Sequence, residues 1–137
     1  MERSSTSNSP ATGEPCERVA LLLIDDDADF RDGLAENLRD DGHPVREYQR
    51  TGEVPAEVLD EVALAIVDYQ LADADGLGFA DHIHTRNPPL PIVLITSYWS
   101  EFLRARTRSR NYLRLLRKPL DYERLHKLVH ELTARQR

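Results

Sequence analysis

Cysteine and long apolar runs are scarce in this sequence, and each scarcity excludes a class of protein. Cys16 is the single cysteine among 137 residues, so no disulfide can form within the chain. This is typical of proteins from a reducing compartment. The longest apolar runs, VALLLI and VALAIV, have six residues each, whereas a membrane-spanning helix needs about 20. A basic start followed by an apolar stretch, as in a signal peptide, is also lacking. We therefore expect a cytoplasmic protein that does not cross a membrane.

Glycine-rich nucleotide loops are absent as well, since neither GxGxxG nor GxxxxGK[ST] occurs. Hydrophobic residues make up 40% of the chain, which is enough for one core in a domain of ordinary size. Residues 1–17 are rich in Ser, Thr, Pro and Gly and poor in apolar side chains. We expect a disordered tail there and a folded domain over residues 18–137.

Short aliphatic runs alternate with segments of helical periodicity in the rest of the chain. The runs at 19–24, 62–68 and 91–96 are typical of strands buried on both faces, and residues 44–48 and 111–117 predict two more strands. The expected helices are one from Ala28 that stops at Gly42, a short one over 51–61, and others over 76–86, 97–110 and 121–137. This β-α alternation predicts a doubly wound α/β fold with five parallel strands and helices on both faces.

Polar side chains follow the carboxyl ends of four of these strands. They are Asp25, Asp26 and Asp27 after the first, Asp68 after the third, Thr96 after the fourth and Lys118 after the fifth. Ligands of open α/β sheets bind beyond the carboxyl ends of the strands, so we expect these groups to converge there. Lys118 draws attention because only two of the 18 basic residues are lysines.

This set of groups suits phosphoryl chemistry. Clustered carboxylates without histidine or cysteine form an oxygen-rich site of the kind that Mg²⁺ prefers. A metal ion, a lysine and a hydroxyl can together hold a phosphoryl group, and a carboxylate can act as the nucleophile and form an aspartyl phosphate. Asp68 is the candidate nucleophile because it is a lone acid at the end of its strand, whereas the acids after the first strand are free to bind metal.

Four motifs, LLLIDDD, IVDYQLADADG, VLITS and LRKPL, together resemble the receiver domain of bacterial two-component response regulators. The resemblance covers about residues 18–135, and the intervals between motifs are also similar to those of the family: 42 residues from Asp26 to Asp68, 28 to Thr96 and 22 to Lys118. It implies a flavodoxin-like (βα)5 fold. By resemblance, Asp68 is the phosphoacceptor, Asp26 a direct Mg²⁺ ligand, Asp25 a ligand through water and the backbone carbonyl of Gln70 a further ligand.

The resemblance also implies a switch. Thr96 is similar to the hydroxyl that turns toward the phosphoryl group, and Lys118 to the lysine that pairs with phosphate and precedes a proline, often through a cis peptide bond. Gly76 matches a glycine eight residues past the acceptor. Leu115 departs from the pattern, because the family usually has Tyr or Phe there. Further departures are Ala72 in place of Pro, and the RNY of residues 110–112 in place of small residues.

Asp27 and the histidines receive plainer interpretations. We expect Asp27 to be exposed or to cap the following helix. His43, His82, His84, His126 and His130 are interpreted as surface or helix-face residues rather than metal ligands, although His126 and His130 share one helix face.

The segment from Glu101 to Lys118 has seven basic residues and one acid in a chain of net charge −6. By resemblance it belongs to the face of the fourth helix, fifth strand and fifth helix, through which receivers act on an output protein. The expected contact residues are Tyr98, Trp99, Phe102, Arg104 and Leu115. Two alternatives stay open: a pseudo-receiver that binds proteins without phosphorylation, and nucleic-acid binding through residues 104–117, which is less favoured.

The chain ends just after the last predicted helix, so we expect a stand-alone receiver without an output domain. It would take a phosphoryl group from a histidine kinase or a phosphotransfer protein and would not itself be an enzyme. Its output protein is not specified by the sequence, and a homodimer is compatible with it.

Overall fold

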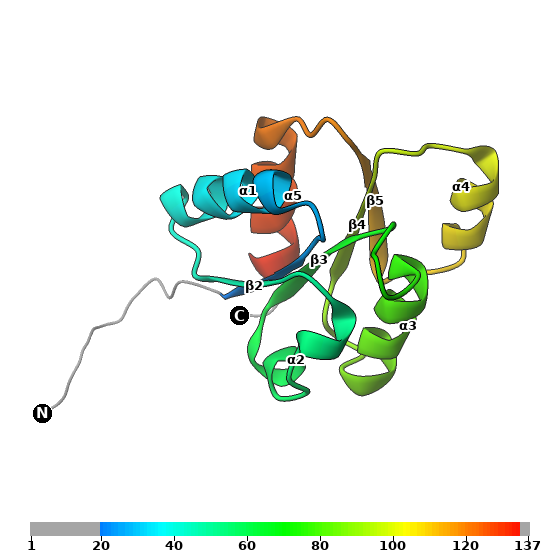
Figure 1. The fold of residues 1–137 in the computed structure, drawn as a ribbon, viewed down its shortest axis with the longest axis horizontal. Coiled ribbons are helices and arrows are strands. Elements are labelled where there is room, and N and C mark those ends of the chain that lie inside the picture. Colours follow the sequence, from blue (N-terminus) through cyan, green and yellow to red (C-terminus); the bar gives the residue numbers. More distant parts are fainter. Residues whose placement is uncertain (1–19, 135–137) are drawn as a thin grey trace, which may run out of the picture.

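The computed structural model describes residues 20–134 (Figure 1). The predicted tail over 1–17, Cys16 and the end of the last predicted helix at 135–137 lie outside the described residues. The strands are β1 (Leu21–Ile24), β2 (Val45–Tyr48), β3 (Leu64–Asp68), β4 (Ile92–Thr96) and β5 (Leu113–Arg117). The helices are α1 (Ala28–Asp40), the 3-10 turn η1 (Thr51–Glu53), α2 (Val58–Glu61), α3 (Gly76–Arg86), α4 (Glu101–Thr107) and α5 (Tyr122–Ala134).

The five strands form one parallel sheet in the order β2-β1-β3-β4-β5. Strands β1, β3 and β4 are buried along their whole length, as expected for the inner strands of such a sheet. The register places Ile24 beside Val67 and Asp68 beside Ile95, so the carboxyl ends of these three strands meet at one edge. The predicted doubly wound, flavodoxin-like α/β fold is confirmed.

Alternate side chains of each inner strand enter two separate cores, one on each face of the sheet. On one face the sheet packs against α1 and α5, through residues such as Leu34 and Val129. On the other it packs against α2, α3 and α4, through residues such as Leu77 and Leu103. Figure 1 shows the same arrangement, with α1 and α5 on one side of the sheet and α2 and α3 on the other.

Two predicted helices are shorter in the structure. The helix expected over 51–61 is divided into η1 and α2, because Val54 is extended, as is usual for a residue that precedes proline. The helix expected over 97–110 runs only from Glu101 to Thr107, because Ser100 caps it by accepting a hydrogen bond from the Leu103 N–H at 3.1 Å. Residues 97–100 are therefore a connection rather than a helical turn.

The α1 helix ends as predicted at Gly42, which has a positive φ of 98° that glycine adopts without steric cost. Asp121 accepts a hydrogen bond from the Arg124 N–H at 3.3 Å, in keeping with its predicted role as the cap of α5. Within residues 20–134, no helix has the length and apolar character needed to cross a membrane.

Candidate functional site

Three carboxylates meet at the carboxyl edge of the sheet, between the ends of β1 and β3. Asp25, Asp26 and Asp68 each have a side-chain oxygen within 4.8 Å of the others. Asp25 and Asp68 are buried, with 1% and 7% of their surfaces exposed, while Asp26 is half-buried. Strand pairing brings these three acids together, because residues that follow neighbouring parallel strands lie at the same edge of the sheet. The convergence predicted from the sequence is therefore present.

Lys118, which follows β5, reaches into this cluster from the far side of β4. Its Nζ lies 3.1 Å from Asp25 Oδ2 and 3.6 Å from Asp68 Oδ2. It also lies 4.0 Å from the centre of the Phe30 ring at the start of α1, a cation–π contact. The Lys118–Pro119 peptide bond is cis. The ammonium group thus sits beside two of the three acids rather than in solvent.

The electrostatics of Asp68 are unusual. Burial, followed by the nearby charge of Asp25, raises the pKa of Asp68 to about 7, and Lys118 and the Gln70 N–H offset only part of this effect. The single ammonium does not neutralise three carboxylates. A site with two buried acids and an excess of negative charge is suited to a cation.

This donor set fits Mg²⁺, the ion implied by the resemblance. The three residues offer only carboxylate oxygens, which are hard ligands, and no histidine or cysteine is among them. Asp25, Asp26 and Asp68 would hold the ion. When bound, Mg²⁺ would offset the negative charge of the acids and of an incoming phosphoryl group.

Asp27 has a different role from its two neighbours. Its side chain is the N-cap of α1 and accepts a hydrogen bond from the Phe30 N–H at 3.2 Å. Its own N–H donates to Asp25 Oδ1 at 2.9 Å, which holds the Asp25 carboxylate in place. The exposed capping residue predicted from the sequence is what the structure contains.

The loop after β3 encloses Asp68 closely. The Gln70 N–H donates to Asp68 Oδ1 at 3.3 Å, and the Gly76 N–H donates to the Tyr69 carbonyl at 2.8 Å. A Cβ atom on Gly76 would lie 2.1 Å from the Asp68 carbonyl oxygen and 2.7 Å from Tyr69 Cα. Only glycine fits there without a backbone shift. The predicted role of the Gln70 carbonyl as a metal ligand stays a prediction.

The Thr96 side chain is fully buried at the end of β4. Its hydroxyl donates to the Tyr98 carbonyl at 3.0 Å and accepts from the Tyr98 N–H at 2.9 Å. These bonds hold residues 97–98 in a tight turn before α4. The Thr96 carbonyl also accepts from the Lys118 N–H at 2.7 Å. The hydroxyl is therefore bonded to the connection that leads to α4, and its predicted turn toward a phosphoryl group stays a prediction.

An aromatic and basic surface follows this turn, and we call it the α4 patch: Tyr98, Trp99, Phe102, Arg104 and Arg117. Tyr98 and Phe102 are 63% and 70% exposed, which is high for large apolar side chains. The guanidinium groups of Arg104 and Arg117 lie 5.9 and 5.5 Å from the centre of the Trp99 ring.

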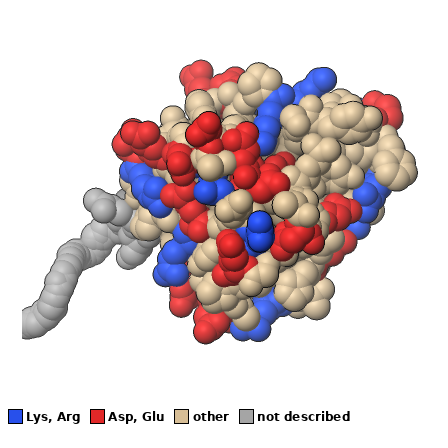
Figure 2. All heavy atoms as spheres, viewed as in Figure 1, with Lys and Arg blue, Asp and Glu red and all other residues tan. Residues whose placement is uncertain are grey.

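Leu115, on β5, is half-buried and packs against the core that includes α4. It thus contributes an apolar contact, but no hydroxyl, at the position where the family usually has an aromatic residue. Figure 2 shows Asp and Glu crowded over the α1 side and the centre of one face, with more uncharged surface toward α4.

The departure at residues 110–112 has a structural explanation that sequence reasoning missed. Arg110 makes two hydrogen bonds to the Asp81 carboxylate of α3, at 2.8 and 2.9 Å, and the Tyr112 hydroxyl donates to the same carboxylate. These contacts, Arg110 first, lower the pKa of Asp81 to about 2. The His84 ring stacks on Tyr112 with ring centres 3.8 Å apart. This set of contacts, the α3–β5 lock, joins α3 to the segment that enters β5.

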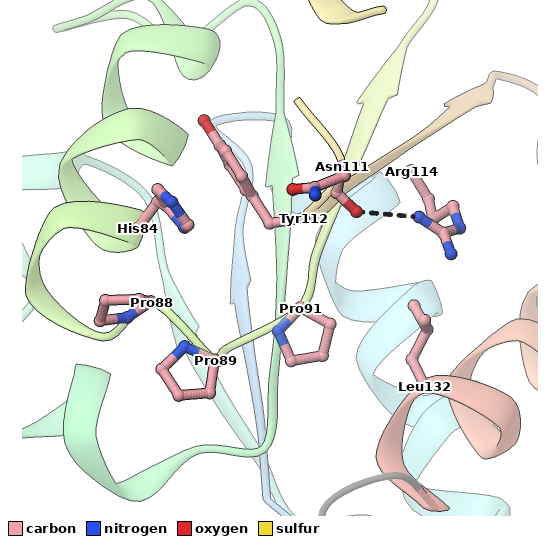
Figure 3. Close-up of a pocket in the computed structure, with 8 residues that line it drawn as sticks. All are labelled: His84, Pro88, Pro89, Pro91, Asn111, Tyr112, Arg114 and Leu132. Atoms are coloured by element: carbon pink, nitrogen blue, oxygen red, sulfur yellow. Dashed lines mark hydrogen bonds between the residues drawn. The ribbon is translucent and has the colours of Figure 1, made fainter. Parts of the chain in front are cut away.

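A cavity of about 570 Å³ lies beside this stack (Figure 3). Pro91 and Tyr112, which line it, precede β4 and β5, so the cavity is at the amino ends of these strands. The carboxylates lie at the opposite, carboxyl edge, where open α/β sheets bind ligands. The cavity is thus separate from the cluster of Asp25, Asp26, Asp68 and Lys118, which we call the acid site.

The fold and the site together define a (βα)5 domain with an acidic, lysine-containing site at the carboxyl edge of its sheet. A family model of the response regulator receiver domain matches residues 21–130. The chain belongs to the response regulator receiver domain family, as the motifs of the sequence predicted.

Curated proteins and solved structures that are similar to this chain support the family assignment. The transcriptional regulatory protein ZraR of Salmonella typhimurium is 28% identical over 121 residues, covering 88% of this chain and 27% of ZraR. The response regulator PilR of Pseudomonas aeruginosa is 30% identical over 115 residues, covering 82% of this chain and 25% of PilR. The crystal structure of the NtrX receiver domain from Brucella abortus has a TM-score of 0.75 at 27% identity and covers 83% of this chain and 98% of that one.

A CheY-like receiver domain from Methanospirillum hungatei has the same fold, with a TM-score of 0.79 at 23% identity over 88% of this chain and 97% of that one. The chain spans about a quarter of the length of the curated relatives ZraR and PilR. The activities of those whole proteins therefore do not transfer to it directly.

Proposed function

We propose that this receiver domain accepts a phosphoryl group on Asp68, with Mg²⁺, from a histidine kinase or a phosphotransfer protein. The observation that carries the proposal is the meeting of Asp25, Asp26 and Asp68 within 4.8 Å of one another, with the Lys118 ammonium 3.6 Å from Asp68. Phosphoryl transfer depends on this kind of positioning and charge neutralisation.

In the proposed reaction an Asp68 carboxylate oxygen attacks the phosphorus of a phosphohistidine. The new P–O bond forms as the P–N bond breaks, and the imidazole leaves with the electron pair and takes a proton. The Gln70 N–H holds one Asp68 oxygen at 3.3 Å, which leaves the other as the nucleophile. Lys118 would neutralise a phosphoryl oxygen, and hydrolysis by water would return Asp68 to its free form.

The output of the reaction is proposed to be a change at the α4 patch. The Thr96 hydroxyl would exchange its bonds to the Tyr98 backbone, at 2.9 and 3.0 Å, for one to a phosphoryl oxygen. The turn before α4 would then be released, and the affinity of Tyr98 and its neighbours for a partner protein would change. In this proposal the chain is a regulatory phosphoacceptor that acts in the cytoplasm, not a classical enzyme.

The test is incubation of the whole chain with acetyl phosphate and Mg²⁺, followed by intact mass measurement. One added phosphoryl group is expected for the wild type and none for Asp68→Asn. A matched control is Asp27→Asn, which keeps a good capping residue and should be phosphorylated like the wild type. The absence of any phosphorylated species, together with the absence of Mg²⁺ binding, would overturn the proposal.

That negative outcome would favour the second candidate, a pseudo-receiver that binds proteins without phosphorylation. The observation on its side is Leu115, which has no aromatic ring or hydroxyl to accompany a switch at Thr96. The buried acids of the site oppose it, since two buried carboxylates beside a third are costly without a function.

Nucleic-acid binding through residues 104–117 is less favoured. Arg106 lies 3.5 Å from Asp75, and Arg110 is paired with Asp81, so these two cations are already partnered by acids of the same chain. A steep salt dependence of binding to duplex or single strands would revive it.

A further inference from the structure

Three histidine rings surround one carboxylate oxygen between the end of α1 and the outer face of α5. The Oδ2 atom of Asp41 lies 3.0 Å from His130 Nε2, 3.3 Å from His126 Nδ1 and 3.5 Å from His43 Nε2. Asp41 and His43 flank Gly42 just after α1, whereas His126 and His130 are one helical turn apart on α5. We call these four residues the His–Asp cluster.

Hydrogen bonding alone does not account for this arrangement well. A carboxylate oxygen accepts about two hydrogen bonds, and three ring nitrogens lie within 3.5 Å of this one. An imidazole nitrogen can also serve as a metal ligand.

The distances match those expected around a metal ion. Zn²⁺ binds histidine nitrogen and carboxylate oxygen at about 2.0–2.2 Å, so two ligand atoms of a tetrahedral site lie about 3.3 Å apart. The separations of 3.0 and 3.5 Å between Asp41 Oδ2 and the ring nitrogens of His130 and His43 bracket this value. Ligand atoms of Asp41, His43 and His130 also lie within 4.8 Å of one another.

The surroundings of the His–Asp cluster favour a cation, and an adjoining cavity gives the cation access to it. Asp41 is the C-cap of the 13-residue helix α1, whose carboxyl end has a partial negative charge. A cavity of about 470 Å³ adjoins the cluster and is lined by Asn37, Tyr122, Glu123, His126, Lys127 and His130. His43 is buried and fixed by its backbone bond to Leu38, while His130 is 61% exposed. One rigid and one accessible imidazole thus face the same carboxylate.

We propose that Asp41, His43 and His130 bind a transition-metal ion of the Zn²⁺ type. Imidazole nitrogen and a carboxylate select such ions over Mg²⁺, so this site is chemically distinct from the acid site. The ion would tie the end of α1 to α5. The sequence interpretation of the histidines weighed His126 and His130 without Asp41 and His43, which the fold brings beside them.

The test is an equilibrium titration of the whole chain with Zn²⁺ in competition with a chromophoric chelator, in excess Mg²⁺ so that the acid site is occupied. We expect one Zn²⁺ per chain. Loss of a second-shell contact usually weakens metal binding about 10–100-fold, so His130→Ala, which removes a direct ligand, should weaken it at least about tenfold. His82→Ala, which removes an exposed histidine of α3, should have no effect.

Two further measurements separate this site from the others. Asp68→Asn should bind Zn²⁺ as tightly as the wild type, because Asp68 is not part of the His–Asp cluster. The zinc proposal would therefore stand even if the phosphorylation proposal failed. Zn²⁺ should also raise the melting temperature of the wild type more than that of His130→Ala, because an ion that binds only the folded chain stabilises it. Equal Zn²⁺ affinity of the wild type and His130→Ala, or no Zn²⁺ binding by the wild type, would overturn the proposal.

Discussion

The acid site and the α4 patch lie at the same edge of the sheet but are built in different ways. Asp25, Asp68 and Lys118 come directly from strand ends, and two of these three are buried carboxylates. Tyr98 and Phe102 of the α4 patch come from a connection and a seven-residue helix, and both are largely exposed. The Thr96 hydroxyl joins the two regions through its bonds to Tyr98.

This difference suggests a division of tasks. The chemistry of phosphoryl transfer needs fixed positions, and parallel strands supply them. The response to it needs a segment of low local stability, and a short helix with exposed apolar side chains has that property. Changes at strand ends should therefore alter metal binding and phosphorylation, whereas changes around α4 and β5 should alter stability or partner binding and leave phosphorylation intact.

The largest effect is expected from the ionisation of Asp68. Because its pKa is raised from 3.8 to about 7, the folded chain binds the extra proton between these values, and stability falls as pH rises through this window. Each pKa unit corresponds to about 1.4 kcal/mol, so the loss in Mg²⁺-free buffer is at most about 4 kcal/mol. Asp68→Asn should lose much less stability between about pH 5 and about pH 8 in urea unfolding. Parallel pH profiles for the two chains would contradict the burial account.

Gly76→Ala should have the next largest effect. The new Cβ would lie 2.1 Å from the Asp68 carbonyl oxygen, so the β3–α3 loop must shift, and overpacking of this kind costs about 1–3 kcal/mol. Gly78→Ala is the matched control, because its Cβ meets nothing within 4 Å and a helical alanine adds up to about 1 kcal/mol. Chemical unfolding of both variants measures the contrast. Equal stabilities would show that the loop is not tightly packed on Asp68.

A smaller effect is expected on Mg²⁺ binding, and it should distinguish Asp26 from its neighbour Asp27. Asp26→Asn should weaken Mg²⁺ binding about tenfold, which corresponds to about 1.4 kcal/mol, because it removes one of the three carboxylates within 4.8 Å of one another. Asp27→Asn should bind Mg²⁺ normally, since Asp27 caps α1 and asparagine is an equally good cap. The Mg²⁺ dependence of the phosphorylation rate distinguishes them. The reverse order of effects would mean that the metal lies elsewhere.

The smallest effect concerns the α3–β5 lock. Arg110→Ala should lower the free energy of unfolding by about 1 kcal/mol, the upper end for a bidentate pair near the surface, since Arg110 holds Asp81 through two bonds. Arg108→Ala, at an exposed position beside α4, should change it little. Both chains should be phosphorylated at the wild-type rate. A slow rate for Arg110→Ala alone would show that the lock supports the acid site.

Most of the acid site could be predicted from the sequence, because each of its groups ends or follows a recognisable strand. Asp27 and Gly42 were predictable for a related reason, since caps and stops are local signals. The connection at 97–100, the α3–β5 lock and the His–Asp cluster were not predicted. Each depends on side chains of elements far apart in the chain, such as Arg110 with Asp81 or His130 with Asp41, and no local pattern reports such pairs.

The most direct test of the central claim follows the fluorescence of Trp99, the single tryptophan of the chain. Trp99 lies in the α4 patch near Arg104 and Arg117. Acetyl phosphate with Mg²⁺ should change the Trp99 emission of the wild type and leave that of Asp68→Asn unchanged. An emission that stays the same in wild-type chain whose mass shows the added phosphoryl group would contradict the claim that chemistry at the acid site alters the α4 patch.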